Sequence, residues 1–563
     1  MPSTTEELKS RFPDLEWFPL PTPEEHPRFI YEPSQSGSTI LGQGHTRSPG
    51  RRAFPIETIF EQDVAIRMRD GITIYADIFR PVGSDQKHPV PAILPWSPYG
   101  KTGTGVQQYE NMAPFRVGLR LDQTSGYEKF EGPDPAEWMH RGYAIVNIDA
   151  RGAGRSEGNL VFWGQQEAED IYDTIEWIAN QPWCNGSVGM AGNSWLAISQ
   201  INFGSRLEHP ALKALAPWEA ENMPAMIDKR PLFDEYWESK YINTVNIKVP
   251  IYVVASYSSQ LHSRGAFHTF RTAKSSKKWL RVHPYQEWYD LYRPDMVDDL
   301  QKYFDRFLKG IDNDWELTTP KVRLSLLGFE AGGGLIPTVR ERPESDWPVP
   351  RQSLKTLFLN ASTKTLQVDK PSNISSCSHS GKDMEATSDF IFYFHDYTEL
   401  AGYAKAELWM SCKEHDDFDV AVQIRKISKD GNPLEHLNYP CPVEIEKVPN
   451  VNTAKALGPQ GFLRASHSCT KVEELSTQQE VFYQHDRREP VRPGSVAKLE
   501  ITFWPMGMIF APGEGIMLRV SGHDMCYPET DKIPPASINN ENVGNHVVHT
   551  GGDHDSKLIL PFI

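Results

Sequence analysis

The sequence lacks several features that would place the protein in a particular class. It has no apolar stretch as long as the roughly 18 residues of a membrane-spanning helix, and its amino terminus is polar and proline-rich, unlike a secretory signal. The six cysteines show no C-x-x-C spacing, so we interpret them as buried filler and not as ligands. The H-E-x-x-H, EF-hand and dinucleotide fingerprints are also absent. We therefore expect a soluble, reduced, cytoplasmic protein with no metal and no organic cofactor.

The chain has fewer basic than acidic residues, 58 against 74, which gives a formal net charge of −16 and a pI near 5.6. Like charges repel, so we expect neither nucleic acid nor an anionic membrane surface as a partner. A small molecule is the remaining class of partner. The length of 563 residues exceeds what one hydrophobic core usually serves, so at least two domains are expected. The sequence leaves the oligomeric state open.

Residues 61–315 have the pattern of an α/β domain. The apolar run 144–149 is typical of a strand buried on both faces. Apolar residues recur at spacings of three and four in 167–180 and in 298–310, which predicts amphipathic helices, and Gly310 suits the end of the second one. We see no internal repeat and no low-complexity tract.

The two ends of the chain have different patterns. Residues 1–60 are rich in proline, serine and charge and are predicted to form an arm that lies on the α/β domain. In residues 316–563 we expect almost no helix, because apolar and polar residues alternate in runs such as 418–425 and 497–503, between Gly and Pro turns. This pattern predicts an antiparallel β-sandwich.

The most informative segment is 189–197, where Ser194 stands between small residues at the junction of a predicted strand and a predicted helix. A sharp strand-to-helix turn strains the serine backbone and leaves room only for small neighbours, here Gly192 and Ala197. The hydroxyl of such a serine stands clear above the sheet, which indicates a nucleophile. The glycine-rich loop 151–158 lacks the lysine of a P-loop, so we interpret it as a tight structural turn without a ligand.

Further segments match one family in the same order along the chain. They include an opening hairpin at 69–81, a Pro-Tyr-Gly-Lys motif within 97–101, the stretch 142–152 and two terminal blocks at 512–520 and 549–561. With the serine turn, the sequence resembles the cocaine-esterase-like (CocE/NonD) family of serine hydrolases, whose relatives include Xaa-Pro dipeptidyl-peptidases and α-amino-acid ester hydrolases. The resemblance implies an α/β hydrolase domain with a reduced helical cap, followed by a C-terminal jelly-roll β-sandwich.

The resemblance also implies the parts of an acyl-transfer site. Such a reaction needs a nucleophile, a base that takes its proton, an acid that orients the base, and donors for the oxyanion. Ser194 is the predicted nucleophile. The backbone N–H of Trp195 and the phenol of Tyr99 are the implied oxyanion donors. The alternative for Tyr99 is a tyrosine that packs at a strand end.

The sequence departs from the family at the base and at the acid. The position of the family's aspartate holds Ser259, and the position of its histidine holds Glu287. Two other histidines lie in the same two loops. His283 is one candidate base, with Glu287 as its orienting carboxylate, and His262 is the other. A lone histidine is more often a structural residue, so a site without a base is the remaining alternative.

The cap is also shortened. Only about thirty residues, 219–248, stand where relatives insert a sizeable helical cap, whose role is to shape the acyl pocket and exclude water. We therefore expect a wider or differently roofed site. Cocaine-like or amino-acyl specificity does not carry over.

Three functional hypotheses follow. The first is a serine hydrolase with a relocated base, which acts on an ester or amide bond of a small or medium acyl substrate. The second is a repurposed member that catalyses cyclisation, condensation or rearrangement of a small-molecule intermediate, including one of secondary metabolism. The third is an inactive binding protein.

Overall fold

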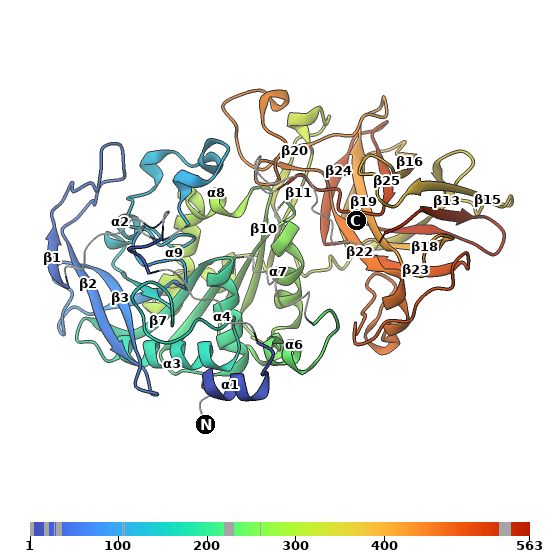
Figure 1. Cartoon of the computed structure of the whole chain (residues 1–563). Helices are drawn as coiled ribbons and strands as arrows, with labels where there is room; N and C mark the ends of the chain where they lie inside the picture. Colours follow the sequence, from blue (N-terminus) through green and yellow to red (C-terminus); the bar gives the residue numbers. More distant parts are fainter. Residues whose placement is uncertain are drawn as a thin grey trace.

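The computed structural model describes residues 5–15, 22–26, 29, 36–103, 105, 107–218, 230–258, 260–528 and 542–563. Figure 1 shows two lobes. The first, drawn in blue to yellow-green, is a sheet covered by helices, and the second, drawn in yellow to red, consists mainly of strands.

The first lobe is built on a 12-stranded sheet with the order β1-β2-β3-β6-β4-β7-β8-β9-β10-β11-β12, in which β5 pairs with β6. The strands from β6 through β11 in that order run parallel, β5 also pairs with β6 in parallel, and the remaining pairs run antiparallel. The bounds are β1 (Gly37–Leu41), β2 (Thr58–Arg67), β3 (Thr73–Pro81), β4 (Val90–Leu94), β5 (Trp96–Ser97), β6 (Ala144–Asp149), β7 (Cys184–Asn193), β8 (Leu212–Trp218), β9 (Ile251–Ser256), β10 (Lys278–His283), β11 (Val322–Leu326) and β12 (Val339–Glu344).

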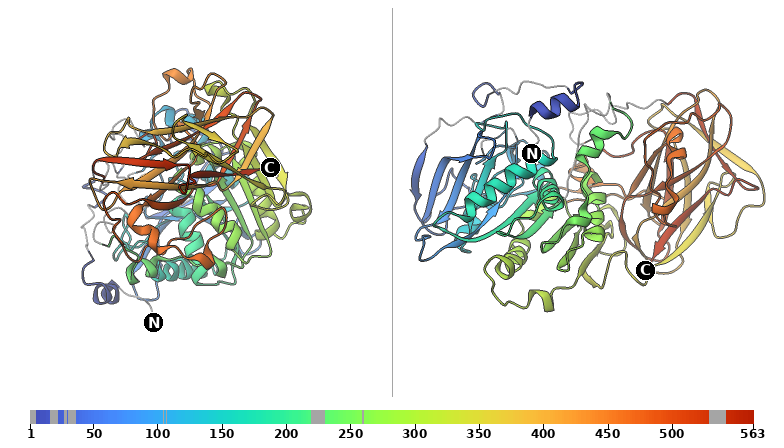
Figure 2. Two further views of the ribbon diagram at one scale, coloured as in Figure 1. Left: turned by 90° about the vertical axis from the view of Figure 1, so that its right-hand side faces the viewer. Right: turned by 90° about the horizontal axis from the view of Figure 1, so that it is seen from below.

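Helices cover both faces of this sheet (Figure 2). Buried side chains of α3 and α7, with Phe203 of α4, belong to one apolar cluster, and those of α2, α8 and α9 belong to another. Successive strand residues alternate between the two clusters, as Ala92 and Ile93 do, because strand side chains point to opposite faces. The helix bounds are α1 (Thr5–Arg11), α2 (Pro135–Met139), α3 (Gln165–Ala179), α4 (Trp195–Arg206), α6 (Glu235–Lys240), α7 (Gln260–Thr272), α8 (Glu287–Leu291), α9 (Pro294–Leu308) and α10 (Trp315–Thr318).

The predicted elements of this lobe are confirmed. The strand at 144–149 is β6, and the two predicted helices are α3 and α9. Gly310 follows α9 with φ 69°, the left-handed conformation in which glycine ends helices at little cost. The sheet continues past residue 315, because α9 leads the chain to the edge where β11 and β12 are added.

In its described residues the second lobe is a 13-stranded, mainly antiparallel β-sandwich, as the alternating pattern predicts, in which β14 and β16 pair in parallel. A separate pair, β20 (His436–Leu437) and β21 (Lys455–Ala456), lies in a long loop. The sandwich strands are β13 (Ser353–Asn360), β14 (Thr365–Gln367), β15 (Ser375–Ser380), β16 (Ser388–Tyr393), β17 (Thr398–Gly402), β18 (Lys405–Cys412), β19 (Asp419–Ile427), β22 (Gln460–Arg464), β23 (Ala497–Thr502), β24 (Met506–Phe510), β25 (Gly515–Ser521), β26 (Asn545–Thr550) and β27 (Lys557–Phe562).

The two lobes share one continuous core. The backbone of Leu327 bonds to Gly507 and to Ile509 of β24 at 2.9 and 3.2 Å. Beside this junction, the fully buried Lys426 forms an ion pair of 2.8 Å with the fully buried Glu514. Such an interface predicts that the lobes move little relative to each other.

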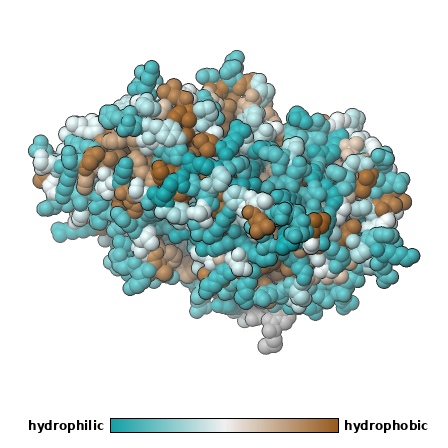
Figure 3. All heavy atoms as spheres, turned by 180° about the vertical axis from the view of Figure 1, so that it is seen from behind, coloured by the Kyte–Doolittle hydropathy of each residue, from teal (hydrophilic) through white to brown (hydrophobic). Residues whose placement is uncertain are grey.

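The face seen in Figure 3 is mostly hydrophilic, with hydrophobic side chains scattered among the polar ones. Scattered apolar residues are normal on a protein surface. Among the described residues, no helix combines the length and the apolar character needed to cross a bilayer.

Candidate active site

The predicted serine turn is present between β7 and α4. Ser194 has φ 50° and ψ −122°, a conformation that an L-residue adopts only under strain. Gly192 precedes it with φ 133°, and a Cβ there would lie 2.4 Å from the Leu196 side chain and 2.8 Å from the carbonyl oxygen of Glu131. Only glycine therefore fits at that position. Ser194 keeps 8% of its surface exposed at the carboxyl end of the central strand.

Tyr99 and Trp195 lie beside each other at this turn. Trp195 is the first residue of α4, where a backbone N–H has no partner within the helix. Tyr99 follows β5, and its ring meets the Trp195 ring edge-on, with 6.3 Å between centroids. The Tyr99 ring also meets that of Phe130, with 5.7 Å between centroids. The two residues implied as oxyanion donors are thus brought together.

The loop that carries Tyr99 is held by a buried lysine. The Nζ of Lys129 donates hydrogen bonds to the carbonyls of Ser97, Gly100 and Ile148 at 3.0, 2.7 and 2.6 Å. Two of these carbonyls belong to residues on either side of Tyr99. Lys129 is fully buried, so an unbonded ammonium would be costly there. Sequence reasoning missed this residue, because no motif marks a lysine that acts through backbone carbonyls.

We expect Lys129→Met to lower kcat/KM for an ester substrate about 10²-fold, the usual cost of misplacing a catalytic group by about 1 Å. Methionine fills a similar volume but cannot donate to the three carbonyls. Lys213→Met is the matched control, since Lys213 is exposed and donates to the Pro210 carbonyl, away from Tyr99. Steady-state kinetics with circular dichroism on both variants would test this. A folded Lys129→Met enzyme with wild-type kcat/KM would contradict the positioning of Tyr99 by Lys129.

A second buried residue fixes Trp195. The Oε1 of Glu167, in the first turn of α3, accepts the indole N–H groups of Trp195 at 2.8 Å and Trp96 at 3.2 Å. Burial raises the pKa of Glu167 to about 7, against the effect of these two hydrogen bonds. The carboxylate ties the start of α4 to α3 and so holds the oxyanion side of the site.

Aromatic residues pack around the side chain of Trp195. The Trp195 ring packs against the rings of Phe162 and Trp163, with 5.0 and 5.5 Å between ring centroids. Phe12, from the amino-terminal segment, packs edge-on against Tyr236 of α6 at 5.6 Å, and both belong to the apolar cluster that contains Trp195. The arm and the short cap thus meet near the site, although residues 219–229 of the predicted cap lie outside the described residues.

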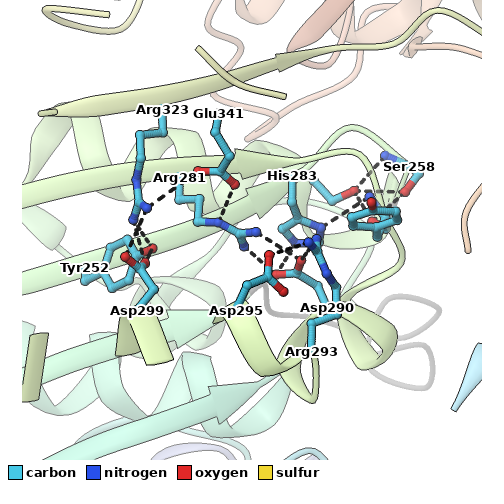
Figure 4. A network of polar contacts seen from close by, with 12 residues as sticks. Tyr252, Ser258, Arg281, His283, Asp290, Arg293, Asp295, Asp299, Arg323 and Glu341 are labelled. Carbon is cyan, nitrogen blue, oxygen red and sulfur yellow. Dashed lines mark hydrogen bonds and ion pairs between the residues drawn. The ribbon is translucent and has the colours of Figure 1, made fainter. Parts of the chain in front are cut away.

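His283 ends β10 inside a buried polar network (Figure 4). Its side chain is fully buried, its Nδ1 accepts the Tyr285 N–H at 3.3 Å, and its Nε2 lies 3.8 Å from Asp290. Asp290 forms an ion pair with Arg281, which lowers the pKa of Asp290 to about 2 although burial alone would raise it. The carboxylate beside His283 is therefore Asp290, and not Glu287 as expected.

This environment makes His283 a poor base. Burial lowers the pKa of His283 to about 3, and the attraction of Asp290 is too weak to restore it. A general base is most efficient when its pKa lies near the working pH. In this structure His283 lies beside the Arg281–Asp290 pair at the end of its strand.

The carboxylate of Glu287 lies instead near His262. Glu287 begins α8, His262 lies in the first turn of α7, and Nε2 of His262 is 4.0 Å from Oε1 of Glu287. Both side chains are about 5% exposed. Their loops follow β10 and β9, whose carboxyl ends lie at the same edge of the sheet as Ser194, and α8 also contacts β7. Ser259, at the family's aspartate position, lies outside the described residues.

Hydrogen bonds hold these two loops together. The hydroxyls of Ser256, which ends β9, and of Ser258 both donate to the Tyr285 carbonyl, at 2.6 and 2.8 Å. The second lobe contributes as well: the Gln286 N–H donates to the Asn438 carbonyl at 2.7 Å, immediately before Glu287. This loop of the second lobe therefore helps to position α8.

A further carboxyl, which sequence reasoning missed, contacts α8 through the side chain of Trp288. Glu131 is 2% exposed, and its Oε1 accepts the indole N–H of Trp288 at 2.7 Å. It comes from the long loop between β5 and β6, and loops of this length are often functional. That length was the one signal in the sequence that could have directed attention to it.

A cavity of about 320 Å³ opens beside this loop. Its walls include Tyr109, Phe130 and Glu128, together with Arg47 and Arg51. Phe130 also contacts Tyr99 and Trp288, so the cavity adjoins the aromatic wall of the site. Among the described residues, no group of three or more His, Cys, Asp or Glu side chains is arranged to hold a metal ion.

Comparisons with known families cover both lobes. Residues 70–222 match the X-Pro dipeptidyl-peptidases of the S15 family, and residues 313–559 match the X-Pro dipeptidyl-peptidase C-terminal non-catalytic domain. Ser194 and Tyr99 lie within the first match. His262 and Glu287 lie between the two matches, in a part of the chain that neither covers.

Curated proteins that match part of this chain include esterases. Cocaine esterase from Rhodococcus sp. is 36% identical over 155 residues, which are 28% of this chain and 22% of that protein. A putative serine esterase from Mycobacterium bovis is 31% identical over 157 residues, or 27% of this chain and 23% of that protein. The alignments thus span less than a quarter of each curated relative.

Solved structures match over a longer range. A CocE/NonD family hydrolase from Staphylococcus aureus superimposes with a TM-score of 0.81 at 29% identity, covering 90% of this chain and 94% of that one. An α-amino acid ester hydrolase covers 90% of this chain and 97% of its own with a TM-score of 0.65 at 17% identity, which shows a shared fold.

Proposed function

Because this chain belongs to the CocE/NonD family of hydrolases, we propose that it is a serine hydrolase that cleaves an ester or amide bond of a small or medium acyl substrate. The observation that carries the proposal is Ser194 in its strained turn, with Tyr99 and the start of α4 beside it. A strained backbone conformation costs free energy, and such conformations cluster at active sites, where they position a reacting group such as this hydroxyl.

In this proposal the acid and the base have exchanged loops. His262 comes from the loop that carries the acid in relatives, and Glu287 comes from the loop that carries their histidine. The 4.0 Å separation of His262 and Glu287 supports this pairing, whereas His283 is held by Asp290. His262 then acts as the base and Glu287 as the carboxylate that orients it and stabilises its protonated form.

The reaction follows from these positions. Ser194 Oγ attacks the acyl carbon and its proton passes to His262, while the developing oxyanion accepts hydrogen bonds from the Trp195 N–H and the Tyr99 hydroxyl. The tetrahedral intermediate collapses, and the leaving group departs with the proton from His262. Water then attacks the acyl-enzyme. His262 takes a proton from the water and returns it to Ser194 Oγ, which gives the acid and the free serine.

The surroundings favour an apolar or aromatic acyl group. The rings of Tyr99, Phe162 and Trp163 pack around the Trp195 ring next to Ser194, and an aromatic cluster of this kind recognises apolar groups. The cavity beside Phe130 has the volume of a small ligand site, and its charged lining suits a polar portion of the substrate.

The test is turnover of a panel of p-nitrophenyl esters with acyl groups from acetyl to phenylacetyl. We expect hydrolysis with a burst of p-nitrophenol, because acylation and deacylation are separate steps. The aromatic residues around Trp195 predict a higher kcat/KM for the phenylacetyl ester than for the acetyl ester. Purified enzyme that releases no p-nitrophenol from any of these esters would contradict the proposal.

Non-hydrolytic chemistry is the second candidate, and the altered acid and base positions favour it. Chromatography of the same reactions with added alcohol or amine acceptors distinguishes the two. Hydrolysis gives the free acid as the main product, whereas a repurposed enzyme transfers the acyl group or returns a cyclised product.

A further inference from the structure

We propose that Glu131 is a second carboxyl of the active site, which donates a hydrogen bond from Oε2 to the bound substrate. This inference rests on the proposed function, since it assigns a further residue to the same site.

The backbone of Glu131 is built into the serine turn. Its carbonyl accepts the N–H of Asn193, the residue before the nucleophile, at 3.1 Å, and its own N–H donates to the phenol oxygen of Tyr109 at 3.1 Å. Glu131 has φ 68°, a left-handed conformation that is costly for a residue with a side chain. The fold thus keeps Glu131 next to the nucleophile turn although its backbone conformation costs free energy.

The side chain of Glu131 is only partly satisfied. Trp288 of α8 donates its indole N–H to Oε1 at 2.7 Å. The Oε2 atom is buried and has no hydrogen-bond partner among the described residues. A buried polar atom without a partner usually has a function or an absent ligand, since leaving it unbonded costs about 1–3 kcal/mol.

The charges around Glu131 favour its protonated form. Burial raises the pKa of Glu131 to about 8, the Trp288 hydrogen bond opposes this, and the negative charge of Glu287 adds to it. The other titratable group facing it is Tyr109, whose pKa burial raises well above 10, and β7 contributes the uncharged Asn193. Within its own segment, Lys129 is engaged with three carbonyls and Glu128 binds the Gly126 N–H.

A neutral carboxyl has an O–H to donate, and a carboxylate has none. At neutral pH, Glu131 therefore supplies a donor to a carbonyl, ether or hydroxyl oxygen of the substrate. Above pH 8 it loses the donor and adds a second negative charge beside Glu287. The proposal predicts that kcat/KM falls above about pH 8, below the range in which Tyr109 ionises.

The test compares pH profiles of kcat/KM for the wild type, Glu131→Gln and Trp288→Phe, with p-nitrophenyl acetate. Glutamine donates through its amide at every pH, so Glu131→Gln should stay within about tenfold of the wild type at pH 7 and lose the alkaline decline. Trp288→Phe removes the indole donor that stabilises the carboxylate, so its decline should move to higher pH.

A Glu131→Gln enzyme that keeps the decline at the same pH overturns the inference. If Glu131→Gln does not fold, a Trp288→Phe enzyme with an unshifted decline overturns it. Either result with an active wild type leaves the proposed function intact, whereas a wild type without ester turnover contradicts the proposed function itself.

Discussion

Replacing Ser194 by alanine should lower kcat for a p-nitrophenyl ester by about 10⁴-fold or more, because the remaining oxyanion donors and binding contacts give only a small part of the acceleration. KM should change little, since the hydroxyl contributes to the transition state and not to substrate binding. Alanine keeps the Cβ of Ser194 and removes only the hydroxyl oxygen, so we expect the fold to be retained. Stopped-flow and steady-state release of p-nitrophenol measure both constants and the acylation burst.

The control for Ser194→Ala comes from the same helix. Ser199 is buried, and its hydroxyl lies within hydrogen-bond distance of the carbonyls of Leu196 and Trp96, so Ser199→Ala removes an equivalent hydroxyl away from the nucleophile. It should lower stability by about 1 kcal/mol and leave kcat near the wild-type value. A Ser194→Ala enzyme that retains turnover would exclude Ser194 as the nucleophile.

The second large effect concerns the base. His262→Ala should lower kcat about 10³-fold or more, and Glu287→Gln should lower it about 10²-fold or more, since the carboxylate acts through the imidazole. The double variant should be little worse than His262→Ala, because two residues that act as one unit are strongly non-additive. A double-mutant cycle on kcat measures this coupling.

The control for the base is His283. His283→Asn preserves an acceptor for the Tyr285 N–H, so the loop should keep its conformation. We expect kcat and its pH profile to be unchanged, apart from a loss of stability at the buried site. If His283→Asn reduced kcat to the level of Ser194→Ala while His262→Ala did not, His283 would be the base after all.

The sequence predicted the architecture well because hydrophobic periodicity depends on local spacing. The runs that became β6, α3 and α9 repeat with the period of their element, and the alternating runs beyond residue 316 became the sandwich strands. The turn around Ser194 was recognisable for the same reason, since its steric demand falls on immediate neighbours such as Gly192.

The polar surroundings of the site could not be predicted in this way. Whether His262 or His283 approaches Glu287 depends on Asp290 and Arg281, which capture His283 through contacts that sequence spacing does not encode. Glu131 and Lys129 belong to a long loop without periodicity, and they reach the site only because that loop folds back over the ends of β6 and β7.

The most direct test of the account is the rate at which a fluorophosphonate labels the protein, with the modified peptide identified by mass spectrometry. We expect rapid labelling on Ser194 in the wild type and in His283→Asn, and labelling slowed at least about 10²-fold in His262→Ala. Labelling of another residue, or labelling of Ser194 at the wild-type rate in His262→Ala, would contradict it.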